Sequence, residues 1–105
     1  MKVVWTNQAY ARLAAIRDYV ARDSVDAAER LVEKLVRKGE RLAAFPESGR
    51  RVPELPVSQL RELVDGNYRI VYRIRGARVQ ILTVFEAHRL FPGEDVCGGA
   101  TFRRK

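Results

Sequence analysis

The sequence is poor in the residue types that build cross-links and metal centres. It has one cysteine, Cys97, and one histidine, His88, which excludes an intramolecular disulfide and a structural zinc site. It also lacks an apolar run of the roughly 20 residues that cross a bilayer, and its N-terminal apolar stretch is too short for a signal peptide. We therefore expect a cytoplasmic protein that binds no metal or cofactor and contacts no membrane.

Sequence motifs of common enzymes are missing as well. The chain has no glycine-rich phosphate loop, no metal-ligand spacing and no nucleophile elbow. What it does have is a globular composition, 47% hydrophobic and 31% charged, over 105 residues, which predicts one folded domain. Lys and Arg number 20 against 13 Asp and Glu, and the resulting charge of +7 favours an anionic partner, such as nucleic acid or an acidic protein.

Apolar spacing in the first half of the chain predicts one strand and two helices. Residues 2–5 are β-formers, and a helix is expected over about residues 7–22, for which Thr6 is a suitable cap. The Asp23-Ser24 pair provides two alternative caps for a second helix. Gly39 lies on the apolar stripe of that helix, where a missing side chain would permit close packing.

The second half of the chain predicts a loop and three strands. Residues 46–59 hold three of the four prolines and are expected to form a surface loop. The strands are expected at 60–64, 68–75 and 78–85. Short turns between them make neighbouring strands antiparallel. The order β-α-α-β-β-β therefore predicts an α+β fold, with a helical hairpin packed on one face of an antiparallel sheet.

The strand at 68–75 alternates between apolar and basic side chains. Because strand side chains alternate between faces, its apolar residues should pack under the helices and its arginines should lie on an uncovered face. We expect this basic sheet face to bind an anion through Arg61, Arg69, Arg73, Arg75 and Arg89. The alternative is a solvated polar face without a binding role.

The other candidate residues are single side chains. His88 is suited to general acid or base catalysis, and it is equally a surface histidine without a role. Three carboxylates are candidate base partners or ordinary surface residues, namely Glu54, Glu62 and Glu86. Two aromatic residues, Trp5 and Phe45, are expected in the core.

Several segments together resemble the RelE/ParE toxin superfamily of bacterial type II toxin–antitoxin systems. The segments are Trp5-Thr6 with Ala9 and Leu13, Ile16 with Tyr19, Ala27-Ala28, residues 45–50 (FPESGR), 52–55 (VPEL), 61–63 (REL), 66–73 (GNYRIVYR) and 79–84 (VQILTV). The resemblance covers about residues 1–91, which we treat as the toxin domain, and leaves residues 92–105 as a C-terminal tail.

The resemblance implies a toxin that is neutralised by a cognate antitoxin carrying an acidic or extended segment. RelE-like members cut mRNA on the ribosome with lysines, arginines and often a late tyrosine or histidine, whereas ParE-like members poison DNA gyrase. This chain has no lysine between Lys38 and Lys105 and no tyrosine after Tyr72. It therefore resembles the ParE-like branch, which implies a gyrase inhibitor rather than an enzyme, with direct nucleic-acid binding secondary.

The alternative implied by the same resemblance is a ribosome-dependent mRNA endoribonuclease. Many relatives carry a histidine just after the last strand, where this chain has Glu86, and His88 follows two residues later. A ribonuclease site would combine His88 as proton carrier and Arg73 as transition-state stabiliser with Arg69 and Glu62. A third interpretation is a member that binds its antitoxin and has lost its toxicity.

Overall fold

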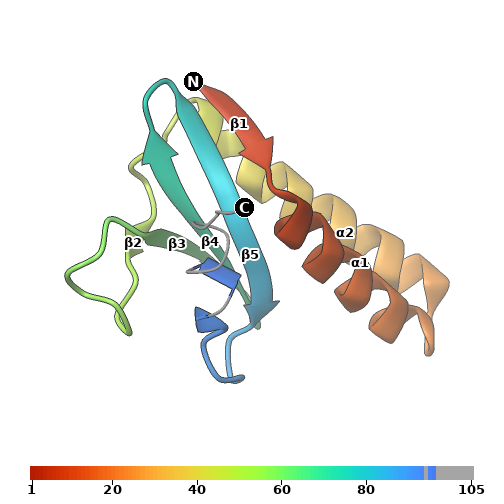
Figure 1. Cartoon of the computed structure of the whole chain (residues 1–105). Coiled ribbons are helices and arrows are strands. Elements are labelled where there is room, and N and C mark those ends of the chain that lie inside the picture. Colours follow the sequence, from red (N-terminus) through yellow and green to blue (C-terminus); the bar gives the residue numbers. More distant parts are fainter. Residues whose placement is uncertain (94, 97–105) are drawn as a thin grey trace.

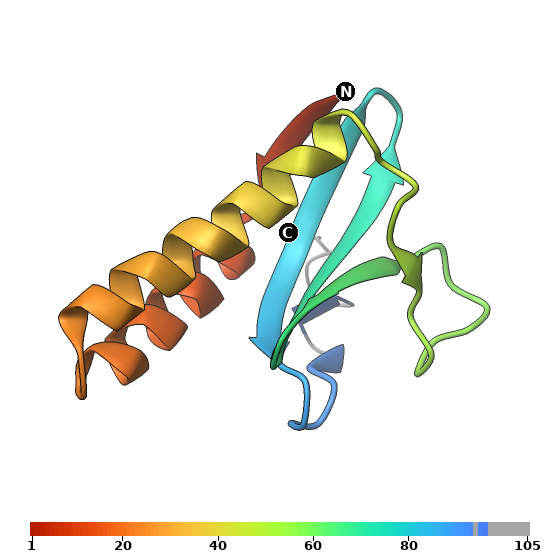
Figure 2. The same ribbon diagram turned by 180° about the vertical axis from the view of Figure 1, so that it is seen from behind.

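The computed structural model of the chain describes residues 1–93, 95 and 96. Two helices lie side by side across one face of a five-stranded sheet (Figures 1 and 2). The elements in chain order are β1 (Lys2–Trp5), α1 (Asn7–Ala21), α2 (Val25–Glu40), the short 3-10 helix η1 (Arg41–Ala43), β2 (Arg50–Arg51), β3 (Arg61–Asp65), β4 (Tyr68–Arg75) and β5 (Arg78–Glu86). The expected α+β fold and its element order are confirmed.

The sheet differs from the expected one in two respects. Its strand order is β1-β5-β4-β3-β2, and β1 pairs with β5 in parallel, so the sheet is mixed rather than antiparallel. Parallel partners need a long connection, which the helices and the intervening strands supply. The second difference is β2, a two-residue strand inside the expected loop, which pairs with β3.

Both helices begin at the side chains that the sequence indicates. The Thr6 hydroxyl accepts the backbone N–H of Ala9 at 3.2 Å, and Ser24, rather than Asp23, accepts that of Ala27 at 3.1 Å. Thr6 also donates its hydroxyl to the carbonyl of Ile81 at 2.8 Å. The start of α1 is therefore fixed to β5, the strand beside the central strand β4.

The main core lies between the helices and the sheet, and one glycine sets its spacing. A Cβ at Gly39 would come within 2.6 Å of the Trp5 ring and 2.9 Å of Ile81 Cδ1, so the close approach expected at Gly39 is confirmed. Trp5 is buried as expected. Phe45 is not: it follows η1 and is 60% exposed, and it lines a surface hollow instead of entering the core.

The opposite face of the sheet is covered, which corrects the expectation of an uncovered face. A second core joins residues of β4 and β5 to side chains from the proline-rich loop and from the segment after β5. Its buried members are Val52, Val71, Leu82, Phe85 and Val96, with Leu55, Leu60 and Phe91 packed against them. The loop and the segment after β5 therefore form a third layer over this part of the sheet.

The first residues of the predicted tail belong to that layer. The buried Asp95 carboxylate accepts two hydrogen bonds from Arg12 of α1, at 2.7 and 3.1 Å, and one from the Thr83 hydroxyl at 2.9 Å. Residues 97–105 of the tail lie outside the described residues. In the part of the chain that is described, no helix is long and apolar enough to cross a membrane.

Candidate functional site

Arg69 is at the centre of a buried ion cluster rather than on a surface. Its guanidinium donates two hydrogen bonds to Glu54, at 2.7 and 2.8 Å, and one from Nε to Glu62 at 2.6 Å. The rings of Phe85 and Phe91 lie 4.9 and 5.6 Å from it. With 6% of the residue exposed, Arg69 has no free face for a phosphate.

The carboxylates of this cluster are fully engaged. Glu62 is 1% exposed and accepts hydrogen bonds from Arg69 through Oε1 and from Arg50 through Oε2, the latter at 2.7 Å. Hydrogen bonding from Arg69 lowers the pKa of Glu54 to about 2, and the same carboxylates raise the pKa of Arg69. Glu54 therefore stays ionised near neutral pH, and both carboxylates are paired with Arg69, an arrangement that holds the loop on the sheet.

Arg61 lies on the other face of the sheet from Arg69. Its register partner is Tyr72, whose ring is in the core under the helices. Arg61 donates to the carbonyl of Gly49 at 2.7 Å, and the Tyr72 hydroxyl accepts the Gly49 N–H at 2.9 Å. Arg61 therefore holds the start of the loop in place. The sequence does not predict this contact, because Gly49 is twelve positions away in the chain.

Arg73 and Arg75 lie at the end of β4 that is remote from Arg69. Arg73 is half-buried and donates Nε to Gln80 at 2.8 Å. Burial and the nearby charge of Arg75 lower the pKa of Arg73. Arg75 is exposed at the β4–β5 turn. These two arginines keep the expected orientation on the face opposite the helices.

Arg89 and His88 lie beyond the opposite end of β5. Arg89 donates Nε to Glu86 at 3.0 Å, and His88 Nε2 is 3.9 Å from Glu86, with 74% of its side chain exposed. Arg73 pairs with Gln80, and Glu86 lies six positions further along β5 than Gln80, which is roughly 20 Å. The structure therefore does not bring His88, Arg73, Arg69 and Glu62 together as one site.

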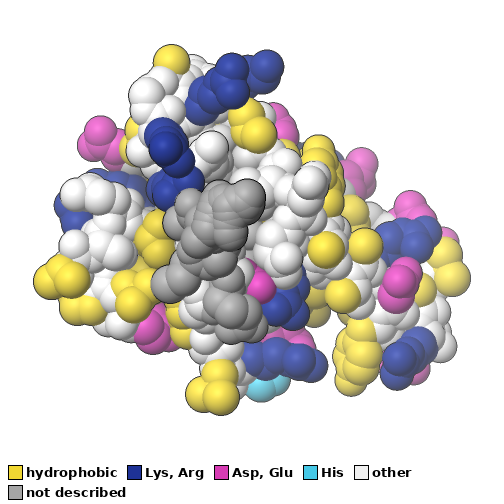
Figure 3. Space-filling model, in the orientation of Figure 1, with side chains coloured by type: hydrophobic (Ala, Val, Ile, Leu, Met, Phe, Trp, Pro, Cys, Tyr) yellow, Lys and Arg dark blue, Asp and Glu magenta, His cyan; other side chains and the backbone are white. Residues whose placement is uncertain are grey.

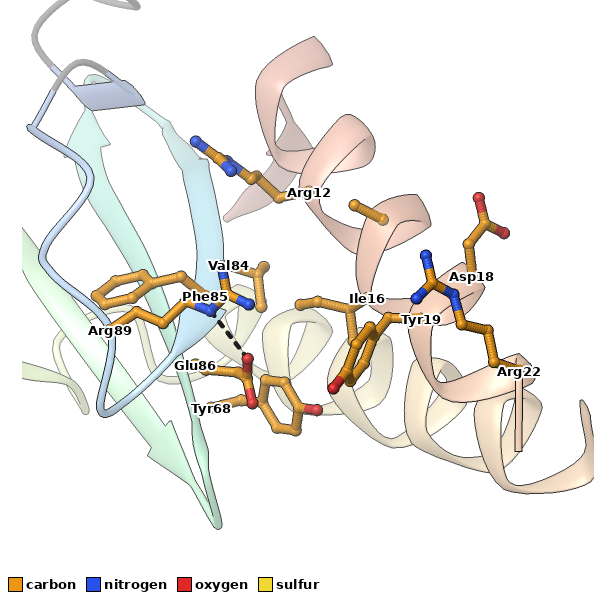
Figure 4. Close-up of a pocket in the computed structure, with 11 residues that line it drawn as sticks. Arg12, Ile16, Asp18, Tyr19, Arg22, Tyr68, Val84, Phe85, Glu86 and Arg89 are labelled. Carbon is orange, nitrogen blue, oxygen red and sulfur yellow. Dashed lines mark hydrogen bonds and ion pairs between the residues drawn. The ribbon is translucent and has the colours of Figure 1, made fainter. Parts of the chain in front are cut away.

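A groove between α1 and the end of the β4–β5 pair is the best-formed hollow among the described residues. It encloses about 400 Å³, and its apolar floor includes Ile16 and Val84. Tyr19, Tyr68 and Arg89 extend toward the same space from different elements (Figure 4). Sequence reasoning missed the groove, although the spacing of Ile16 and Tyr19 places both on one side of α1. The structure adds that Tyr19 is 60% exposed.

The groove combines apolar and charged groups in a way that suits a peptide. Arg12, Arg22 and Arg89 border the apolar floor, with Asp18 and Glu86 also on the rim. An amphipathic segment docks in such a groove with its apolar side chains inward and its acidic ones toward the arginines. In the part of the chain that is described, no cluster of His, Cys, Asp or Glu could hold a metal ion.

Comparison with known proteins places the chain among the small α+β toxins of type II toxin–antitoxin systems. More narrowly, it belongs to the ParE toxin family: the family described as "ParE toxin of type II toxin-antitoxin system, parDE" matches residues 3–91. Toxin RelE2 of Caulobacter vibrioides is 41% identical over 90 residues, covering 85% of this chain and 98% of that protein. The putative toxin Y4kP of Sinorhizobium fredii is 40% identical over 93 residues, with 87% and 93% covered.

Two solved structures have similar folds. The chromosomal ParDE toxin–antitoxin system from P. aeruginosa gives a TM-score of 0.72 at 28% identity, covering 84% of this chain and 97% of that one. The RelBE2 toxin–antitoxin complex from Mycobacterium tuberculosis gives 0.60 at 19% identity, with 81% and 88% covered. The second likeness concerns the fold alone.

Proposed function

We propose that this toxin inhibits DNA gyrase without acting as a nuclease and that a cognate antitoxin neutralises it. The observation that carries the proposal is the fate of the ribonuclease candidates. Arg69 and Glu62 neutralise each other in a buried cluster, and His88 lies beside Glu86, which is roughly 20 Å along β5 from the level of Arg73. The match to the ParE family over residues 3–91 supports the same target.

The test is a supercoiling and cleavage assay with purified gyrase, relaxed plasmid and the full chain free of antitoxin. We expect lost supercoiling and accumulated linear DNA, both relieved when antitoxin is added first. His88→Ala should behave as the wild type, because the His88 side chain is 74% exposed and lies 3.9 Å from Glu86 without a hydrogen bond to it. Undisturbed supercoiling by a folded toxin would contradict the proposal.

A second candidate function is ribosome-dependent mRNA cleavage, which the name of the Caulobacter relative, RelE2, favours. Primer extension on ribosome-bound mRNA distinguishes the two functions. Cleavage by the wild type that His88→Ala and Arg73→Ala abolish, each with an unchanged circular dichroism spectrum, would establish the ribonuclease and displace gyrase as the target.

We place the antitoxin in the groove between α1 and the sheet. The groove joins an exposed aromatic residue, Tyr19, to an apolar floor and a rim with arginines, and the chain as a whole carries +7. Opposite charge speeds capture of an acidic partner, and a buried aromatic anchor supplies most of the affinity. The P. aeruginosa structure is likewise that of a toxin–antitoxin system.

Tyr19→Ala tests this placement. We expect antitoxin affinity to fall by about 30-fold or more, the effect of removing an interface anchor of about 2 kcal/mol or above. The matched control is Tyr10→Ala, because Tyr10 is similarly exposed on α1, at 57% against 60%, and does not line the groove. The affinities are measured by isothermal titration calorimetry. Equal affinities of the two variants for the antitoxin would show that the antitoxin does not bind in the groove.

A further inference from the structure

Three cations lie side by side across neighbouring strands at one end of the sheet. Lys2 of β1 is in register with Arg78 of β5, and Arg78 is in register with Arg75 of β4. We call these residues, Lys2, Arg75 and Arg78, the cation row. All three are exposed, and Figure 3 shows Lys and Arg side chains gathered near the end where Figure 1 places the N-terminus and the β4–β5 turn.

The three side chains share one face of the sheet. Their chain neighbours Val3, Ile74 and Val79 pack into the core under the helices. Because successive side chains of a strand point to opposite faces, the cation row points away from the helices. Nothing in the described part of the chain neutralises it: none of the three residues forms an ion pair with a described carboxylate.

Such a row is unfavourable unless an anion completes it. Like charges directly opposite each other on a sheet repel, and this chain places them on three adjacent strands. The spacing fits a phosphate backbone. Neighbouring strands are about 4.8 Å apart, so the row spans about 10 Å, and it can reach more than one phosphate of a DNA strand, which carries one charge for every 3.4 Å of helix axis.

We propose that the cation row binds the phosphate backbone of double-stranded DNA without reading its sequence. The row lines none of the three best-formed hollows of the described residues, and its exposed side chains are better placed for an extended phosphate backbone than for the anchoring side chain of an acidic peptide. The choice of duplex DNA as the polyanion rests on the proposed action on gyrase. The cation row itself follows from the strand register.

The row is also remote from the groove. Arg78 begins β5, and Glu86, at the rim of the groove, ends it, so about 26 Å of strand separates the two. A DNA backbone on the row and a peptide in the groove therefore occupy opposite ends of β5.

The experiment measures binding of the full chain to a fluorescein-labelled random-sequence duplex of 20 base pairs by anisotropy, between 50 and 200 mM salt. The variants are Arg75→Gln with Arg78→Gln and, as the matched control, Arg30→Gln with Arg37→Gln, two exposed arginines of α2. Both double variants lower the net charge by two. The assay contains no gyrase, so its result is independent of whether gyrase is the target.

We expect the row variant to lose about 1.8 from the slope of log K against log salt, because each lost phosphate contact removes about 0.9. The wild type should then weaken by about 12-fold more than the row variant over this fourfold salt range. The control variant should keep the wild-type slope. An unchanged slope for the row variant, an equal loss in both variants, or no binding by the wild type at 50 mM salt would each overturn the proposal.

Competition with poly-glutamate distinguishes DNA from an acidic protein as the anion that binds the cation row. If the row variant bound DNA as the wild type does and lost affinity only for poly-glutamate, the row would serve an acidic protein and the proposal would be wrong. Thermal unfolding of each variant by circular dichroism shows whether the chain is folded. We expect the melting temperature of the row variant to equal or exceed that of the wild type.

Discussion

Arg69 and Arg75 lie on the same face of the same strand and have opposite surroundings. Arg69 is buried, with two carboxylates and two aromatic rings around its guanidinium. Arg75 is exposed, and its register partner is another arginine, Arg78. One end of the face is therefore electrostatically complete within the chain, and the other end is left for a partner.

The difference comes from segments that are distant in the sequence. Glu54 reaches Arg69 from the proline-rich loop, and Glu62 reaches it from β3. Neither segment supplies a carboxylate to Arg75. A strand pattern fixes the face on which an arginine lies, but the rest of the chain decides whether that arginine becomes part of the structure or remains available for binding.

Removing the buried cation is expected to have the largest effect on stability. Arg69→Met leaves Glu54 and the buried Glu62 without their main partner, and breaking a buried ion pair on one side costs about 3–5 kcal/mol. Arg75→Met is the matched control and should change the free energy of unfolding by less than about 0.5 kcal/mol. Urea denaturation measures both. Similar losses in the two variants would mean that the two ends of the face do not differ as described.

Adding a side chain at Gly49, where the loop packs closely on the sheet, should have the next largest effect on stability. A Cβ at Gly49 would lie 2.6 Å from the backbone oxygen of Glu62 and 2.6 Å from the Tyr72 hydroxyl. Because a backbone atom cannot move aside easily, Gly49→Ala should cost about 1–3 kcal/mol. Gly93→Ala is the control, since its Cβ meets nothing within 4 Å. Thermal unfolding measures the effect. A melting temperature of Gly49→Ala equal to that of the wild type would show that the loop and the sheet leave room for a Cβ at this position.

The end of the face around Arg69, whose charges are paired within the chain, should also be the part whose stability depends on acidic pH. The pKa of Glu54 is lowered from 4.5 to about 2 by its hydrogen bonds from Arg69. A lowered pKa in the folded state stabilises the fold above the unfolded pKa, so this contribution is lost as the pH falls from about 4.5 toward 2. Glu54 is 41% exposed, and solvent screening limits the loss to about 1 kcal/mol.

The measurement is urea denaturation of wild type and Glu54→Gln at pH 7, 4.5 and 3. The glutamine variant should start less stable and should lose less stability on acidification than the wild type. Parallel pH curves for the two proteins would assign the acid sensitivity to other carboxylates.

The sequence was sufficient for the fold because local signals agreed with one another. Thr6 and Ser24 cap the helices, Gly39 lies where Trp5 needs space, and turns fall between the last three strands. The parallel pairing of β1 with β5 was beyond these signals. It depends on where the helical hairpin returns the chain, which no local pattern encodes.

The candidate site was predicted only in part, because burial is not a local property. The arginines of β4 were assigned to the correct face, yet Arg69 is covered by a loop whose Val52 and Leu55 enter a second core. Arg61 was assigned to the wrong face, since its register with Tyr72 became visible only in the folded sheet. Arg78 was expected near the turn at one edge of this face, but its neighbour Lys2 was overlooked because β1 and β5 are far apart in sequence and adjacent in space.

The smallest expected effect is a gain in stability from a substitution in the cation row, at the other end of the face. Arg78 is flanked by Lys2 on one side and by Arg75 on the other, so Arg78→Gln removes two repulsive neighbours at once. Like charges directly opposite on a sheet cost a few tenths of a kcal/mol to about 1 kcal/mol, and the variant should be more stable by that amount in urea. The gain should shrink in high salt, because screening weakens the repulsion in the wild type. A salt-independent loss of stability would show instead that Arg78 supports the fold. A salt-sensitive gain would mean that the chain keeps this charge at the expense of its own stability, as expected of a residue retained to bind a partner.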